Sequence, residues 1–216
     1  MKKVIATAVA VAAAFAGVLV PTASAAPSSP AAQTMTLESV RLTPQQRESL
    51  DKVVAVRDHF YAGENGRLAI DLSDEELKSE YGFTDEELEM LHRDTLGIDI
   101  EKTDEEVRAA VQGLKQERVY RNGTAVCFIH DDLVVGVGVA LVAAAEAGPA
   151  AIAAAISTVS TLIGGPVAGV LGTTLSLAGF TSLAGMGLYI TSAVATGRGV
   201  EIGVKADYPP VFTTYC

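Results

Sequence analysis

The chain has 216 residues, of which 49% are hydrophobic, and its formal net charge is −10. This length suits one domain of ordinary size or two small ones. The negative charge argues against binding to nucleic acid and against simple adsorption to anionic lipid, because both select basic surfaces. The charge is unevenly distributed: residues 26–132 hold 23 acidic and 12 basic side chains, whereas residues 133–197 hold one charged side chain, Glu146.

Residues 1–25 have the three parts of a secretory signal peptide: two lysines, an uncharged stretch and small residues at the end. Ala23 and Ala25 predict cleavage after Ala25, with cleavage after Ala26 as an alternative. A retained N-terminal anchor helix is a further alternative, but no charged stop-transfer cluster follows the uncharged stretch. We therefore expect an exported protein that is secreted or associated with the cell envelope.

The next segment, residues 26–42, begins with Pro, Ser and Ala and is expected to be a disordered lead-in. Residues 43–116 are expected to form an acidic helical domain or pro-region, whose first helix runs from Pro44 to about Tyr61. In each of its four helix starts a hydroxyl residue is followed three positions later by Gln or Glu, which is a capping box. The four expected N-caps are Thr43, Ser73, Thr84 and Thr103.

The acidic clusters could also be interpreted as a metal site, but helix capping accounts for nearly all of these carboxylates, and the spacing of an EF-hand is absent. His130 follows Cys127 by three residues, yet no motif around this pair supports a catalytic cysteine. The chain lacks the motifs of nucleotide-binding loops, serine hydrolases and zinc proteases. We therefore expect no enzymatic activity, no metal and no small-molecule cofactor.

Residues 117–216 are expected to form a hydrophobic module that begins and ends with β-structure. Asn122-Gly123 lies between β-prone residues and predicts a hairpin, and residues 200–205 alternate as a strand does. In an oxidising compartment Cys127 and Cys216 are expected to pair, with free thiols or intermolecular bonds as the alternative. The small sheet would then act as the neck of a helical bundle.

Gly and Pro divide the apolar residues 133–196 into three pieces, of which the third, residues 166–196, is long enough to span a bilayer. The second piece, of 14 residues, would be a helix of only about 21 Å. Gly165, Gly169 and Thr173 repeat every four residues, which predicts a small face for close helix packing. Because Ala- and Gly-rich helices bury little area, residues 133–196 are expected to contact a lipid bilayer or a second copy of the chain.

This order of a signal, a charged region and a small-residue-rich hydrophobic module resembles that of exported bacteriocin precursors, in composition and order only. The resemblance implies a secreted membrane-active protein, a pore-former precursor whose acidic half masks the hydrophobic module. The alternative is a non-catalytic cell-envelope protein that uses the apolar bundle as its core or as an oligomer interface. A third alternative is an envelope protein anchored by residues 166–196. In each case we expect a mostly α fold with a small β element.

Overall fold

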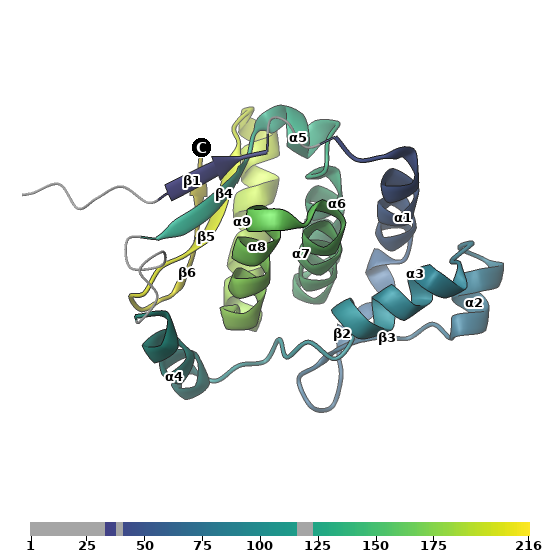
Figure 1. The fold of residues 1–216 in the computed structure, drawn as a ribbon, viewed down its shortest axis with the longest axis horizontal. Helices are drawn as coiled ribbons and strands as arrows, with labels where there is room; N and C mark the ends of the chain where they lie inside the picture. Colours follow the sequence, from purple (N-terminus) through teal and green to yellow (C-terminus); the bar gives the residue numbers. More distant parts are fainter. Residues whose placement is uncertain (1–32, 38–40, 116–122) are drawn as a thin grey trace, which may run out of the picture.

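The computed structural model describes residues 33–37, 41–115 and 123–216, so the expected signal peptide and its cleavage site lie outside the described residues. The fold is mostly helical with a small β component (Figure 1). The helices are α1 (Pro44–Ala55), η1 (Arg57–His59), α2 (Asp74–Ser79), α3 (Asp85–Met90), η2 (Leu91–Thr95), α4 (Asp104–Leu114), α5 (His130–Val134), α6 (Val139–Ala147), α7 (Pro149–Ile163), α8 (Gly165–Leu177) and α9 (Phe180–Thr196). The strands are β1 (Gln33–Thr36), β2 (Phe60–Ala62), β3 (Leu68–Ile70), β4 (Thr124–Phe128), β5 (Val200–Val204) and β6 (Val211–Tyr215).

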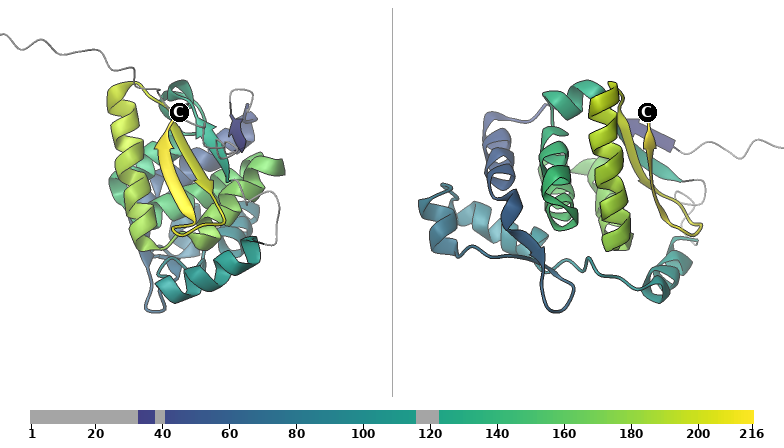
Figure 2. Two further views of the ribbon diagram at one scale, coloured as in Figure 1. Left: turned by 90° about the vertical axis from the view of Figure 1, so that its left-hand side faces the viewer. Right: turned by 180° about the vertical axis from the view of Figure 1, so that it is seen from behind.

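These elements form successive layers, which Figures 1 and 2 show edge-on. A four-stranded sheet of order β1-β4-β5-β6 lies at one end, and α8 and α9 contact its inner face. The pair α6 and α7 packs on α8 and α9, and α1, η1, η2 and the β2–β3 hairpin cover the other side of that pair. We call α6 and α7 the apolar layer, residues 43–100 the cover, and α8, α9 and the four-stranded sheet the base.

Helix α7 lies at the centre of the hydrophobic core. Ten consecutive residues, Ala150 to Val159, are buried. One hydrophobic cluster extends from Leu50 in the cover through Ile156 to Ile202 in the sheet. A helix that is apolar on all sides must be buried on all sides, and here the cover and the base together provide those contacts.

The first helix and the expected disordered lead-in both differ from the sequence-based expectation. The first helix was expected to reach about Tyr61 but stops at Ala55, because Phe60 is extended and pairs with Ile70 in the β2–β3 hairpin. Within residues 33–36, where a disordered lead-in was expected, the chain forms β1, which runs parallel to β4 and pairs Gln33 with Thr124. Hydrogen bonds to a neighbouring strand, rather than local preference, order this polar segment.

The third apolar piece, which was long enough to span a bilayer as one helix, is two helices. Helix α8 ends at Leu177, and α9 begins at Phe180. Ala178 has an extended backbone, and Lys102 donates to its carbonyl. Gly179 lies so close to Lys102 that an added Cβ would be 3.3 Å from the Lys102 carbonyl oxygen. Within the described ranges, no helix combines the length and the hydropathy that a membrane crossing needs.

The β-structure of the hydrophobic module is largely as expected. The closing strand is β5, and β6 follows it as a hairpin partner. The second strand of the expected hairpin is β4, while residues 118–122 lie outside the described residues. Both edges of β4 are paired, one with β1 and the other with β5, so β4 is a central strand and has no free edge for the hairpin partner expected across Asn122-Gly123.

Candidate functional site

The four expected N-caps are all formed, and they account for much of the acidic surface. Thr43, Ser73, Thr84 and Thr103 each accept a hydrogen bond from the third backbone amide of the helix, and the Gln or Glu at that position accepts one from the cap amide. The bond from the Ser73 amide lowers the pKa of Glu76, and the Thr103 hydroxyl and amide lower that of Glu106. In the part of the chain that the structure describes, no cluster of residues could hold a metal ion.

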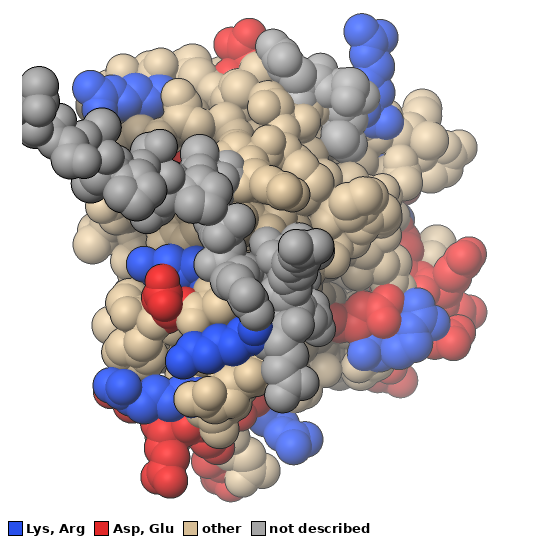
Figure 3. Space-filling view, turned by 60° about the vertical axis from the view of Figure 1, so that its left-hand side comes forward, with Lys and Arg blue, Asp and Glu red and all other residues tan. Residues whose placement is uncertain are grey.

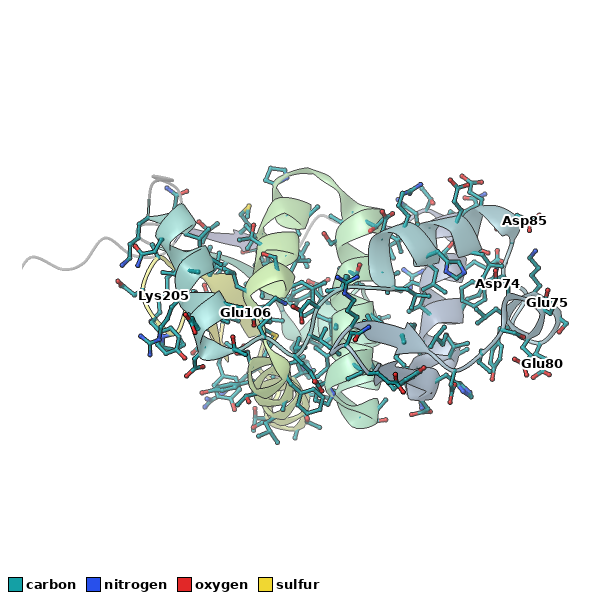
Figure 4. The ribbon with its side chains drawn as sticks, turned by 90° about the horizontal axis from the view of Figure 1, so that it is seen from below. Asp74, Glu75, Glu80, Asp85, Glu106 and Lys205 are labelled. Atoms are coloured by element: carbon teal, nitrogen blue, oxygen red, sulfur yellow. A yellow bond between two sulfur atoms is a disulfide. The ribbon has the colours of Figure 1, made fainter. Side chains whose placement is uncertain are left out.

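One group of acidic side chains lies far from the sheet. Figure 4 shows Asp74, Glu75, Glu80 and Asp85 around α2 and the start of α3, at the opposite end of the molecule from Lys205. In Figure 3 charged side chains concentrate in the lower part and at one side, while much of the upper part is uncharged. The acidic side chains of α2 and α3 are therefore far from the base, whereas α4, with Glu106, lies at the same end as Lys205.

Ion pairs hold the cover together internally. Lys52 on α1 contacts Glu87 on α3 at 2.8 Å, and both side chains are largely buried. Burial by itself raises the pKa of Glu87, but hydrogen bonds from Lys52 and from the Thr84 amide outweigh it and lower the pKa to about 2. Three more pairs join elements of the cover: Lys78–Asp85, His92–Asp74 and His59–Asp71. Every ion pair between two described residues lies within residues 48–94, inside the cover.

The contact between the cover and the apolar layer is different, because it is mostly apolar. Val53, Val54 and Phe60 of the cover face four alanines of the layer across a cavity of about 10 Å³, which Arg57 also lines. These alanines are Ala140 and Ala144 on α6 and Ala151 and Ala155 on α7. Their small side chains let the cover approach the helices closely.

A few hydrogen bonds supplement this apolar contact. The Ser157 hydroxyl on α7 donates to the Asp94 carbonyl at 2.6 Å, and the Thr95 hydroxyl lies 3.3 Å from the Ser157 hydroxyl. At the end of α7, the Gln46 side chain donates to the Leu162 carbonyl at 2.8 Å. These bonds give partners to polar groups that the contact would otherwise bury without a hydrogen bond. None of the bonds involves a charged side chain.

Beyond the cover, the chain is fastened to the base by cations. Lys102 donates to the Asp99 carbonyl and, at the C-terminus of α8, to the carbonyl of Ala178 at 3.3 Å. Burial lowers the pKa of this lysine. A cation at this position interacts favourably with the negative end of the helix dipole. On α4 the Arg108 guanidinium lies 4.0 Å from the centre of the Tyr208 ring.

The expected disulfide between Cys127 and Cys216 is formed, so neither sulfur is a free nucleophile. The bridge joins β4 to the end of the chain, beside the point where Phe128 pairs with Val200. The chain therefore leaves the sheet for α5–α9 and returns to it at paired positions. This arrangement is the neck that the sequence predicted.

The expected packing face of Gly165, Gly169 and Thr173 lies on the outer side of α8, where the two glycines do not pack against another described helix. A Cβ at Gly165 or Gly169 would meet no heavy atom within 4 Å, and the Thr173 hydroxyl bonds to the Gly169 carbonyl. Larger side chains decide which side of α8 is buried, and these are Val170, Leu171, Thr174, Leu175 and Leu177.

Close approach between two helices occurs instead at Gly187, where α9 meets α7 and α6. The sequence did not single out this glycine. A Cβ there would lie 3.0 Å from Ile152 and 3.7 Å from the Ala145 carbonyl. Nothing in the sequence distinguishes this glycine from its neighbours on α9.

No protein-family model matches this chain, and neither a curated protein nor a solved structure is similar to it.

Proposed function

We propose that this is an exported membrane-active protein in which the acidic cover shields the apolar layer from water until the cover opens. The observation that carries the proposal is the contrast between the two kinds of contact. Ion pairs join the elements of the cover to one another, whereas apolar side chains and a few hydrogen bonds join the cover to α6 and α7. Lipid hydrocarbon can replace an apolar contact but cannot replace an ion pair.

The composition of the apolar layer supports the same proposal. Helices α6 and α7 contain one charged side chain, Glu146, which is exposed near the end of α6. A helix that is apolar on all sides is stable either inside a protein or in a membrane. Opening the cover would exchange the first environment for the second and would break no ion pair between described residues. The N-terminal sequence supports export, and the resemblance in composition to bacteriocin precursors supports an action on membranes.

One observation favours the alternative of a non-catalytic cell-envelope protein. The cover and the base already bury α7 from Ala150 to Val159, so the folded chain needs no membrane to shield this helix. In that case the cover would be a permanent part of the core. The two functions differ in one requirement: a membrane-active protein needs the cover to open, and a cell-envelope protein with a permanent core does not.

A crosslink between the cover and the layer tests the proposal. The hydroxyls of Thr95 and Ser157 are 3.3 Å apart, so the double variant Thr95→Cys/Ser157→Cys places two sulfurs within bonding reach. The double variant Thr95→Ala/Ser157→Ala has the opposite effect at the same two positions, because it removes the hydrogen bonds of both hydroxyls and loosens the contact. Dye release from phosphatidylcholine vesicles should be fastest with the alanine variant, slower with the unaltered mature chain and absent with the crosslinked protein.

Mass spectrometry of the crosslinked protein verifies that both disulfides are formed, and the single variant Thr95→Cys controls for the substitution itself. Equal dye release by the crosslinked and alanine variants would show that cover opening is irrelevant. An absence of release from all of them would favour the cell-envelope alternative.

A further inference from the structure

Helices α8 and α9 contact the sheet directly, whereas the apolar layer packs on α8 and α9. Helix α8 contacts β4 and β5, and α9 contacts β5 and β6. The Tyr215 hydroxyl on β6 donates to the Ser192 hydroxyl on α9 at 2.9 Å, and the rings of Tyr189 and Tyr215 are 5.3 Å apart. Helices α6 and α7 instead lie between the base and the cover, as the right-hand view of Figure 2 shows.

The neck keeps the base together whatever the layer does. Antiparallel pairing from Thr124–Val204 to Phe128–Val200 holds β4 beside β5, and β6 extends the same sheet. The Cys127–Cys216 disulfide adds a covalent link across these three strands. Both ends of the α5–α9 segment are therefore held at one place, and a helix pair within the segment can move without separating the strands.

Glycines mark both ends of the apolar layer. Gly136 and Gly138 lie between α5 and α6 and pack closely against Asp132, whereas Gly164 lies between α7 and α8 and Gly165 is the first residue of α8. Gly164 and Gly165 have φ of 67° and 63°, and a Cβ at either would meet nothing within 4 Å. Backbone conformations that glycine adopts readily are common where one element turns against another. The layer is thus joined to α8 by an open connection rather than by a packed one.

We infer that α6 and α7 form the surface that contacts the hydrocarbon of a bilayer, while α8, α9 and the sheet stay together as a base closed by the neck. The inference rests on the proposed function and names the part of the chain that performs it. The choice of lipid over another protein comes from charge: α6 and α7 contain one charged side chain, Glu146 near the end of α6, so this surface offers almost no charged partner for the polar rim of a protein interface.

The chain contains no tryptophan, so one introduced tryptophan reports on a single position. Three exposed positions sample the three parts: Thr161→Trp on α7, Leu188→Trp on α9 and Tyr61→Trp on β2. The side chain of Leu188 is 75% exposed, so its reporter tests whether the base meets lipid directly. Each reporter is placed in the full mature chain with Thr95→Ala/Ser157→Ala, which loosens the cover.

Vesicles of brominated phosphatidylcholine quench a tryptophan that lies in hydrocarbon. We expect Thr161→Trp to lose most of its fluorescence and to shift to shorter wavelength, while Leu188→Trp and Tyr61→Trp keep the spectra they have in buffer. Val142→Trp on α6 is a second reporter for the layer, with the same expected loss. Circular dichroism of each variant in buffer verifies that the fold is retained.

Other outcomes separate this inference from the proposed function. Quenching of Leu188→Trp without quenching of Thr161→Trp, together with dye release, would place the lipid contact on the base and overturn the inference alone. Protection of Thr161→Trp from both brominated lipid and aqueous acrylamide would show that a second copy of the chain covers the layer, which also overturns it. If the fluorescence of every reporter stays as it is in buffer and no dye is released, the proposed function itself is contradicted.

Discussion

Helices α1–α4 and helices α6–α9 are stabilised by different kinds of interaction. Each of the first four begins with a complete capping box. None of the last four has a side-chain hydrogen bond at its N-cap, which is glycine in every case. Local bonds therefore define the acidic helices, whereas packing defines the apolar ones. The acidic helices therefore have stabilising bonds of their own at their starts, while the apolar helices depend on apolar surroundings.

The largest expected effect concerns the neck, which closes the segment that contains α6–α9. Replacing Cys127 and Cys216 together by alanine opens a loop of 89 residues and should lower the free energy of unfolding by about 4–5 kcal/mol. Urea unfolding of the mature chain measures the loss. A decrease below about 1 kcal/mol would show that strand pairing alone closes the neck.

The next effect sharpens the contrast at the contact between the cover and the layer. Phe60 is 7% exposed and faces the alanines of α6 and α7, so Phe60→Ala should cost about 3–4 kcal/mol. The neighbouring Tyr61 is 46% exposed, and Tyr61→Ala should change the stability by no more than about 0.5 kcal/mol. Urea unfolding measures both. Similar losses for the two variants would mean that the contact is not the apolar one described.

A smaller effect tests the ion pairs inside the cover by pH. The pKa of Glu87 is about 2 in the folded state, below its ordinary value of 4.5, so its contribution is complete above pH 4.5 and disappears as the pH falls to 2. This difference corresponds to about 3 kcal/mol. Glu87→Gln should remove this part of the pH dependence between pH 6 and pH 2.5, measured by urea unfolding.

Glu89→Gln is the matched control, because its side chain is 78% exposed and its ion pair with Arg93 spans 3.8 Å. It should leave the pH profile unchanged. If both variants follow the same profile as the unaltered chain, the Lys52–Glu87 pair does not stabilise the cover.

The smallest effect tests local capping. Thr103→Ala removes the hydroxyl that accepts from the Glu106 amide and should destabilise α4 by about 1 kcal/mol, whereas Thr103→Ser should retain most of the stability. Hydrogen exchange of the amides in the first turn of α4 measures the difference. Equal exchange rates in the two variants would mean that packing, rather than the cap, stabilises α4, as it does α6–α9.

Local signals made much of the acidic half predictable. A hydroxyl followed by Gln or Glu at the third helical position is sufficient to specify a helix start, and all four expected starts are present. Gly82 and Gly97, which follow α2 and the α3–η2 helix, have φ of 72° and 83°, which favours glycine over other residues. The disulfide and β5 were likewise expected from cysteine number and from alternation.

The sequence by itself determined where charge and capping lie, because those effects act over a few residues. Tertiary structure alone decided that residues 33–36 form a strand, that α8 and α9 are separate helices and that Gly187, rather than Gly165 and Gly169, allows close helix packing. In a segment made mostly of Ala, Gly and Val, many helix faces look alike. The choice among them depends on which neighbours the rest of the chain brings into contact, and no local pattern contains that information.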